Sequence, residues 1–133
     1  MGDETMQALV VDDSQAVRDL LTDHLGQLGF QVQQAADGLE ALARLAQMPR
    51  FAIVLLDWAM PGMDGLEVLR RMRSDGRFTE VPVVMVTTET ELPNIADALD
   101  AGASEYLMKP FDAQSLLEKL LLLGVDPELR RAA

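Results

Sequence analysis

Five polar side chains that could carry chemistry stand where short apolar runs of the sequence end: Asp12, Asp13, Asp57, Thr87 and Lys109. The runs that precede them are 8–11, 53–56, 83–86 and 106–108. Short apolar runs without polar alternation are typical of strands that are buried on both faces, as in a parallel sheet. The carboxyl ends of parallel strands lie at the same edge, so we expect these side chains to meet there.

Three carboxylates at one edge repel one another unless a cation binds between them. Magnesium is the best candidate, with manganese as a substitute, because Mg²⁺ binds carboxylate oxygens together with water and phosphate oxygens. Asp57 could then attack phosphorus as a carboxylate nucleophile and form an aspartyl phosphate. The Lys109 ammonium and the Thr87 hydroxyl would bind the phosphoryl oxygens. The residues therefore predict a phosphoryl-accepting site.

Strands and helices alternate along the chain, without internal repeats. The expected strands are 7–11, 31–35, 53–57, 83–86 and 105–108. Apolar residues at helical spacing predict helices around 17–28, 39–45, 66–72, 92–101 and 113–123. Local signals mark several boundaries: Gly29 is a natural helix stop, Asp64 is placed to cap a helix, and the second helix should end before Pro49.

Five strand-helix units predict an α/β fold, a doubly wound parallel sheet with right-handed crossovers and helices on both faces. The first, third and fourth strands are apolar and should be central, whereas the polar second strand and the short fifth strand should be edges. This gives the flavodoxin-like order 2-1-3-4-5. In that order the chain winds in opposite directions from strands one and three, which leaves a crevice beyond their carboxyl ends. Asp12, Asp13 and Asp57 fall in that crevice, on strands roughly 4.8 Å apart.

Length and composition narrow the class of protein. The 133 residues predict a single domain over 1–133, with its core over about 7–124 and a short C-terminal tail. Asp and Glu outnumber Lys and Arg by 22 to 11 without a basic block, which argues against direct binding of nucleic acid. There is no cysteine, so disulfides and thiolate zinc sites are excluded. No apolar run approaches the roughly 20 residues that span a bilayer, and the acidic start lacks the basic head of a signal peptide, so we expect a cytoplasmic protein without membrane contact.

Each candidate residue also has an ordinary structural interpretation when it is taken alone. Asp13 or Ser14 could simply cap the first helix. Asp57 could be a solvated loop carboxylate, Thr87 a strand-end hydroxyl and Lys109 a surface cation. Their joint placement at matching strand ends favours one functional site over separate structural roles.

Four separated motifs hold the candidate residues. They are Val11-Asp12-Asp13-Ser14, Leu56-Asp57-Trp58-Ala59-Met60-Pro61-Gly62-Met63-Asp64-Gly65, Val86-Thr87-Thr88-Glu89 and Met108-Lys109-Pro110-Phe111. This combination resembles the receiver domain of two-component response regulators, and looks closest to stand-alone chemotaxis receivers of the CheY type. The resemblance covers nearly the whole chain.

Carried over by position, the resemblance implies that Asp57 accepts a phosphoryl group from a histidine kinase. Asp13, Asp57 and the backbone carbonyl of Ala59 would be direct metal ligands, and Asp12 would act largely through water. A family member of this kind catalyses its own phosphoryl transfer and slow autodephosphorylation but is not a conventional enzyme.

The resemblance also implies a switch and a cis Lys109-Pro110 bond. Phosphorylation would draw Thr87 and Lys109 toward the phosphate, after which Tyr106 turns inward and a surface on the fourth helix, fifth strand and fifth helix changes. The residues implied for that partner surface are Thr90, Leu92, Ile95, Leu99, Tyr106 and Lys119. The protein would act as a monomer on a downstream protein, with the flagellar motor switch as one candidate.

Two positions depart from the chemotaxis pattern and leave alternatives open. Ala59 stands where close chemotaxis relatives carry Asn. This departure leaves open how long the aspartyl phosphate persists and whether the usual phosphatase recognises the protein. Leu92 replaces a basic residue of the motor-binding surface, so a phosphorelay intermediate or a phosphate sink remains an alternative. An Asp-nucleophile phosphatase would typically need a second Asp at position 59, and an unphosphorylated receiver-like scaffold would not need the intact set of site residues.

Overall fold

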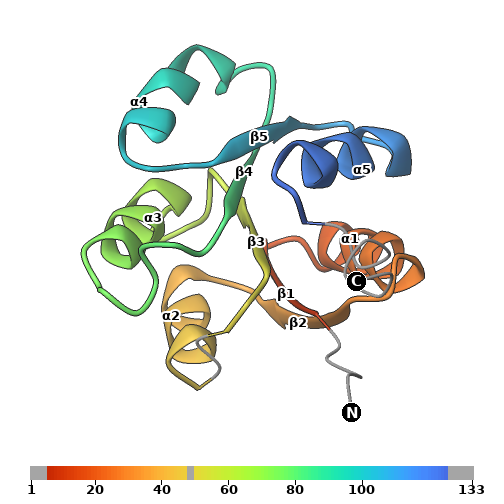
Figure 1. Ribbon diagram of the computed structural model, residues 1–133. Helices are drawn as coiled ribbons and strands as arrows, with labels where there is room; N and C mark the ends of the chain where they lie inside the picture. Colours follow the sequence, from red (N-terminus) through yellow and green to blue (C-terminus); the bar gives the residue numbers. More distant parts are fainter. Residues whose placement is uncertain (1–5, 48–49, 126–133) are drawn as a thin grey trace.

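The computed structural model describes residues 6–47 and 50–125, and these form one parallel sheet between two layers of helices (Figure 1). The strands, in the order β2-β1-β3-β4-β5, are β1 (Gln7–Val11), β2 (Gln31–Ala35), β3 (Ile53–Asp57), β4 (Val83–Thr87) and β5 (Glu105–Met108). The helices are α1 (Gln15–Gln27), α2 (Gly38–Gln47), α3 (Gly65–Arg73), the 3₁₀ turn η1 (Leu92–Asn94), α4 (Ile95–Asp100) and α5 (Ala113–Leu122). The predicted flavodoxin-like fold and strand order are confirmed.

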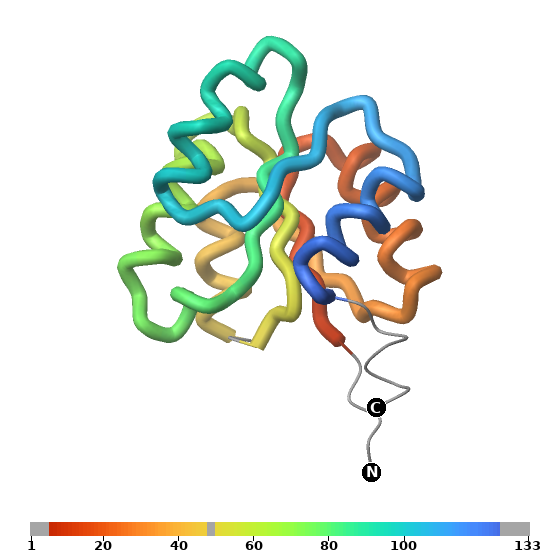
Figure 2. Tube along the Cα trace, turned by 45° about the horizontal axis from the view of Figure 1, so that its top comes forward, coloured from red at the N-terminus to blue at the C-terminus, as the bar shows by residue number. Residues whose placement is uncertain are grey.

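Helices α1 and α5 cover one face of the sheet, and α2, α3 and α4 cover the other (Figures 1 and 2). Successive strand residues point to opposite faces. On β1, Leu9 packs in the core beneath α2 and α3, whereas Val10 packs in the core beneath α1 and α5. Because both cores are apolar, the central strands have no polar alternation.

The edge strands also follow the prediction. In β2 only Ala35 is fully buried, and the other four residues are partly or fully exposed. The polar composition of β2 therefore reflects its place at the sheet edge.

Pro82 directly precedes the central strand β4, where its missing N–H does least harm.

Side-chain caps fix where two helices near the candidate site begin. Ser14 Oγ accepts from the Val17 N–H at 3.3 Å at the start of α1, so Ser14 is the cap and Asp13 is left for other roles. Asp64 caps α3 through the Glu67 N–H at 2.9 Å, as predicted. Gly29, after α1, has φ 99°, a conformation that favours glycine.

Two details of the helices differ from the prediction. The continuous α-helix predicted over 92–101 is wrong at its start, where Leu92–Asn94 forms a 3₁₀ turn and α4 begins only at Ile95. Pro93 lies in the first turn of this 3₁₀ segment, where a residue without an N–H is tolerated. Leu39 is 70% exposed although its spacing suggested the core, because Ala41 and Leu45 fill that face of α2.

Some predictions fall outside the described residues or are settled by them only in part. The C-terminal tail beyond Val125 and the helix stop at Pro49 lie outside 6–47 and 50–125. Within those ranges no helix is long and apolar enough to cross a membrane. In α5, Leu116 and Leu120 are buried whereas Leu122 is 71% exposed, so the leucine-rich stretch is core on one side only.

Candidate phosphoryl-accepting site

The carboxyl ends of the central strands bring the acidic residues together. Asp12 directly follows β1 and Asp57 is the last residue of β3, which pairs with β1 in parallel register. One carboxylate oxygen each from Asp12, Asp13 and Asp57 lies within 4.8 Å of the other two. The predicted acidic cluster is therefore present in the folded protein.

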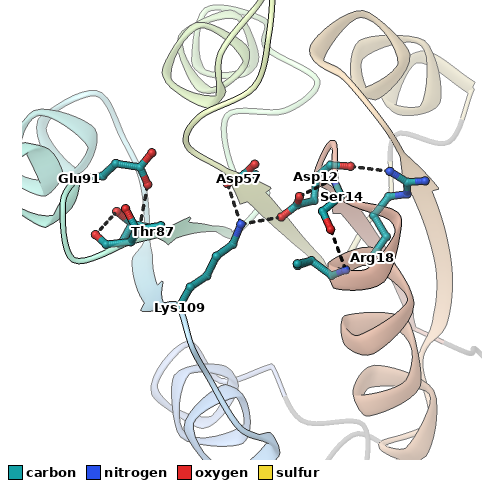
Figure 3. Close-up of polar contacts among 9 residues, drawn as sticks. Asp12, Ser14, Arg18, Asp57, Thr87, Glu91 and Lys109 are labelled. Carbon is teal, nitrogen blue, oxygen red and sulfur yellow. Dashed lines mark hydrogen bonds and ion pairs between the residues drawn. The ribbon is translucent and has the colours of Figure 1, made fainter.

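Lys109 reaches into this cluster from the end of β5 (Figure 3). Its Nζ lies 3.0 Å from Asp12 Oδ2 and 3.2 Å from Asp57 Oδ1. Burial by itself lowers the pKa of Lys109, but the close contacts with the charged carboxylates of Asp12 and Asp57 outweigh burial and raise this pKa. Lys109 is therefore a permanent cation between two buried carboxylates.

Asp57 is only 3% exposed, and its pKa is raised from 3.8 to about 6, with burial as the largest cause. The charge of Asp12 contributes to this rise, the contact with Lys109 opposes it, and the charge of Asp13 adds a smaller increase. Asp57 is thus a carboxylate at neutral pH whose negative charge is poorly stabilised by its surroundings. Such a group gains from any cation that binds beside it.

The donor set fits a hard divalent cation. Asp13 is exposed, and within the described residues its carboxylate makes no hydrogen bond or ion pair. Asp12 Oδ1 accepts from the Ser14 N–H at 2.8 Å, while the buried Asp12 Oδ2 has Lys109 beside it without hydrogen-bond geometry. These oxygens are the ligand type that Mg²⁺ prefers. The carboxylate oxygens of Asp13 and Asp57 have fewer protein partners than those of Asp12.

Gly65 allows the chain after β3 to return close to Asp57. Its N–H donates to the Trp58 carbonyl at 2.9 Å. A Cβ added at Gly65 would lie 2.2 Å from the Asp57 backbone oxygen, and 3.1 Å from the Met85 methyl group. The glycine in the Asp64-Gly65 motif is therefore required by the packing of α3 against the strand end that carries the nucleophile.

Two predicted residues are near the site without joining the carboxylates. Thr87 is fully buried at the end of β4, but its hydroxyl donates to the Thr88 carbonyl at 3.2 Å. The Thr88 N–H in turn donates to Glu91 Oε1 at 2.9 Å (Figure 3). Ala59 is exposed in the loop after β3. A phosphoryl contact by Thr87 would require its hydroxyl to leave the Thr88 carbonyl.

The residues expected on the partner surface come from α4, β5 and α5 and the loop before them. Tyr106 is partly buried, and Lys119 Nζ lies 4.4 Å from the centre of its ring while also pairing with Glu105 at 3.2 Å. Thr90 and Leu99 are exposed, and Ile95 is partly buried. The Lys109-Pro110 bond is cis, as the resemblance implied.

Sequence reasoning missed three residues that hold the loops of the site. Arg18 donates to the backbone carbonyl of Asp12, the Gln34 side chain accepts from Arg18, and the Glu91 carboxylate accepts from the Thr88 N–H. Arg18 lies on α1 and Gln34 on β2, so no local spacing in the sequence predicts their contact. The glutamate three residues after Thr88 is a capping-box signal that could have been found.

Comparison with known proteins identifies the family of the chain. The model of the response regulator receiver domain matches residues 8–121. The chain belongs to this family. A receiver domain of the CheY type is a two-component signalling protein and not a conventional enzyme.

Individual relatives are similar along almost their whole length. The chain is 41% identical over 123 residues to the chemotaxis protein CheY1 of Helicobacter pylori, which covers 91% of this chain and 99% of the relative. It is 41% identical over 118 residues to CheY-3 of Vibrio cholerae, covering 88% and 90%. The crystal structure of Vibrio cholerae CheY4 at low pH superposes with a TM-score of 0.83 at 35% identity, covering 89% and 98%.

We expect Asp57→Asn to stabilise the metal-free receiver domain at neutral pH. The pKa of Asp57 is raised from 3.8 to about 6 on folding, so the folded state binds a proton more tightly and loses stability as the pH rises between these values. A difference of about two pKa units corresponds to about 3 kcal/mol, and we expect Asp57→Asn to recover about 2 kcal/mol because its amide still contacts Lys109.

Urea unfolding in EDTA at pH 4 to 8 measures this effect. The difference between Asp57→Asn and the unsubstituted protein should grow between about pH 4 and pH 6 and then level off. The exposed cap substitution Asp64→Asn is the control, because Asn caps a helix as well as Asp does. A stability difference that does not change with pH would contradict the burial argument.

Proposed function

We propose that the protein is a phosphorylation-activated switch of a two-component system, in which Asp57 accepts a phosphoryl group from a histidine kinase. The observation that supports this best is the buried Asp57 carboxylate, with Lys109 Nζ 3.2 Å away and two further carboxylates beside it. That arrangement provides a nucleophile, a fixed cation and oxygen ligands for a metal. Membership of the receiver family supports the same assignment.

In the transfer, one Asp57 oxygen attacks phosphorus and the bond between phosphorus and the kinase histidine nitrogen breaks. The electron pair of that bond goes to the imidazole nitrogen, and because the other ring nitrogen carries a proton, the leaving group is a neutral histidine. Lys109 donates hydrogen bonds to the phosphoryl oxygens, and Thr87 adds its hydroxyl after it leaves the Thr88 carbonyl. The chain therefore contributes mainly positioning and neutralisation of charge.

Mg²⁺, with Mn²⁺ as a substitute, would be held by Asp13, Asp57 and the Ala59 carbonyl, with Asp12 acting largely through water. When bound, the cation supplies positive charge that relieves the repulsion among the carboxylates and the phosphoryl oxygens. Without it, the Lys109 ammonium alone faces three carboxylates and an incoming anion. We therefore expect phosphoryl transfer to require the metal.

The output surface is the face formed by α4, β5 and α5. An aspartyl phosphate adds about −1.5 to −2 charges beside Thr87 and Lys109. Movement of Thr87 toward those charges draws in the loop that precedes α4, and Tyr106 then turns inward. Because the relatives are chemotaxis proteins, we propose a cytoplasmic chemotaxis role, with the flagellar motor switch as the first partner to test.

A small phosphodonor such as acetyl phosphate, supplied with Mg²⁺, tests the proposal directly. Intact-protein mass spectrometry should show one covalent phosphoryl group that persists for longer than the mixing time and is absent in EDTA. Rapid turnover of the donor without a lasting adduct would instead indicate a phosphatase. Absence of any adduct would indicate a receiver-like scaffold.

A pull-down then identifies the output. The bait is the receiver domain with and without beryllofluoride, which mimics the aspartyl phosphate, and the expected result is a partner that binds the loaded form more tightly. A flagellar switch protein among the captured partners would support motor control, whereas a histidine phosphotransfer protein would support a phosphorelay role. Equal capture by both forms would contradict a switch.

A further inference from the structure

Arg18, on α1, lies beside Asp12 but does not pair with any carboxylate of the acidic cluster within the described residues. Its Nη1 donates instead to the backbone carbonyl of Asp12 at 2.7 Å (Figure 3). A charged donor to a carbonyl makes a stronger hydrogen bond than a neutral donor does. The strongest contact of Arg18 is therefore with the peptide group that joins Asp12 to Asp13.

That peptide group determines where the Asp13 side chain can lie. The chain before it is anchored by the Asp12 N–H, which donates to the Ala35 carbonyl at 3.1 Å. The chain after it is anchored by the Ser14 N–H, which donates to Asp12 Oδ1 at 2.8 Å. The Asp13 carboxylate itself makes no hydrogen bond or ion pair within the described residues, and the Arg18 hydrogen bond restrains the peptide plane to which Asp13 is attached.

Arg18 is in turn held in place by the neighbouring edge strand. Its Nε donates to Gln34 Oε1 at 3.1 Å. The Gln34 amide donates to Thr22 Oγ1 at 2.8 Å and to Asp19 Oδ1 at 3.3 Å, both on α1. The guanidinium is thus oriented by a network that begins on β2 and ends at the Asp12 carbonyl.

We propose that Arg18 is a positioning residue for the metal site, which orients the Asp12-Asp13 peptide so that the Asp13 carboxylate faces Asp57. This inference rests on the proposed function, since it takes Asp13 and Asp57 as ligands of Mg²⁺. Groups that orient metal ligands typically contribute 10- to 100-fold to metal affinity. Removal of Arg18 should therefore weaken Mg²⁺ binding by about tenfold.

The sign of the effect separates positioning from simple electrostatics. Arg18 carries a positive charge close to a site for a cation, so a purely electrostatic role predicts tighter Mg²⁺ binding after its removal. A positioning role predicts weaker binding despite the loss of that repulsion. The two interpretations therefore give opposite results in the same titration.

The experiment is a Mg²⁺ titration of metal-free protein, followed by Trp58 fluorescence and by calorimetry, with each variant first shown to be folded in EDTA by urea unfolding. Arg18→Met should bind Mg²⁺ about tenfold more weakly. Arg18→Lys keeps one donor for the Asp12 carbonyl and should recover part of the loss, and Gln34→Leu should give a smaller loss than Arg18→Met. Arg71→Met is the matched control, because Arg71 is 54% exposed on α3 and pairs with Glu67.

Each outcome decides the inference. Unchanged or tighter binding by Arg18→Met overturns it while leaving the proposed function intact, provided that the unsubstituted protein binds Mg²⁺ and accepts a phosphoryl group. Failure of the unsubstituted protein to bind Mg²⁺ overturns both. If Arg18→Met does not fold, Arg18→Lys and Gln34→Leu decide: weaker binding by both supports positioning, and unchanged binding by either overturns it.

Discussion

Asp57→Asn is expected to abolish covalent phosphorylation of the protein by acetyl phosphate and by any histidine kinase. The neutral amide lacks the negative oxygen that attacks phosphorus. The other two acids are poor substitutes, because Asp12 has one oxygen bonded to the Ser14 N–H and the other beside Lys109, and Asp13 is exposed at the mouth of the cluster. Intact-protein mass spectrometry and mapping of the labelled peptide measure the effect.

Asp64→Asn is the matched control for this loss of labelling. Asp64 lies in the loop after the same strand, is exposed, and is used to cap α3, a role that Asn fills equally well. Its labelling should equal that of the unsubstituted protein. Label retained by Asp57→Asn on any peptide, or a loss of labelling in Asp64→Asn, would show that the nucleophile has been assigned wrongly.

Gly65→Ala is expected to destabilise the fold by about 3 kcal/mol, the upper part of the range for overpacking a core. The added methyl group would lie 2.2 Å from the Asp57 carbonyl oxygen, which belongs to a central strand and cannot move without moving the nucleophile. The protein must therefore shift either α3 or the end of β3. Urea unfolding measures the loss of stability, and labelling of the folded fraction should fall as well.

Gly26→Ala is the matched control for Gly65→Ala, and we expect it to have the opposite effect on stability. Gly26 lies in α1, and nothing lies within 4 Å of a Cβ placed there. Alanine in a helix is favoured over glycine by roughly 0.5–1 kcal/mol, so this variant should be more stable than the unsubstituted protein. If both substitutions had the same effect on stability, the close approach of Gly65 to Asp57 would not be the cause.

The sequence by itself determined the architecture and the candidate nucleophile. Apolar runs that lack alternation are characteristic of strands buried on both faces, and the polar second run could only be an edge strand. Parallel strands end at one edge, so the sequence predicts that Asp12, Asp57 and Lys109 meet there. Caps such as Asp64 were also predictable, because a helix start depends on a few neighbouring residues.

Details that depend on contacts between distant segments were decided only by the tertiary structure. The spacing of Leu39 suggested the core, but Ala41 and Leu45 fill the buried face of α2 and leave Leu39 exposed. Arg18 and Gln34 are 16 positions apart and meet only because β2 lies beside β1. The Thr87 hydroxyl was expected to face the nucleophile but bonds to its own loop.

One physical reason explains why the sequence determines some features of this protein and only the tertiary structure decides others. Burial and strand direction follow from the pattern of side chains along the chain, since each element must hide its apolar surface. The direction of a hydroxyl, a guanidinium or a carboxylate depends on which donors and acceptors the fold brings within about 3 Å, and those partners come from other elements. The sequence thus determined which groups collect at the sheet edge, and only the folded structure decided which of them are free to bind a metal or a phosphoryl group.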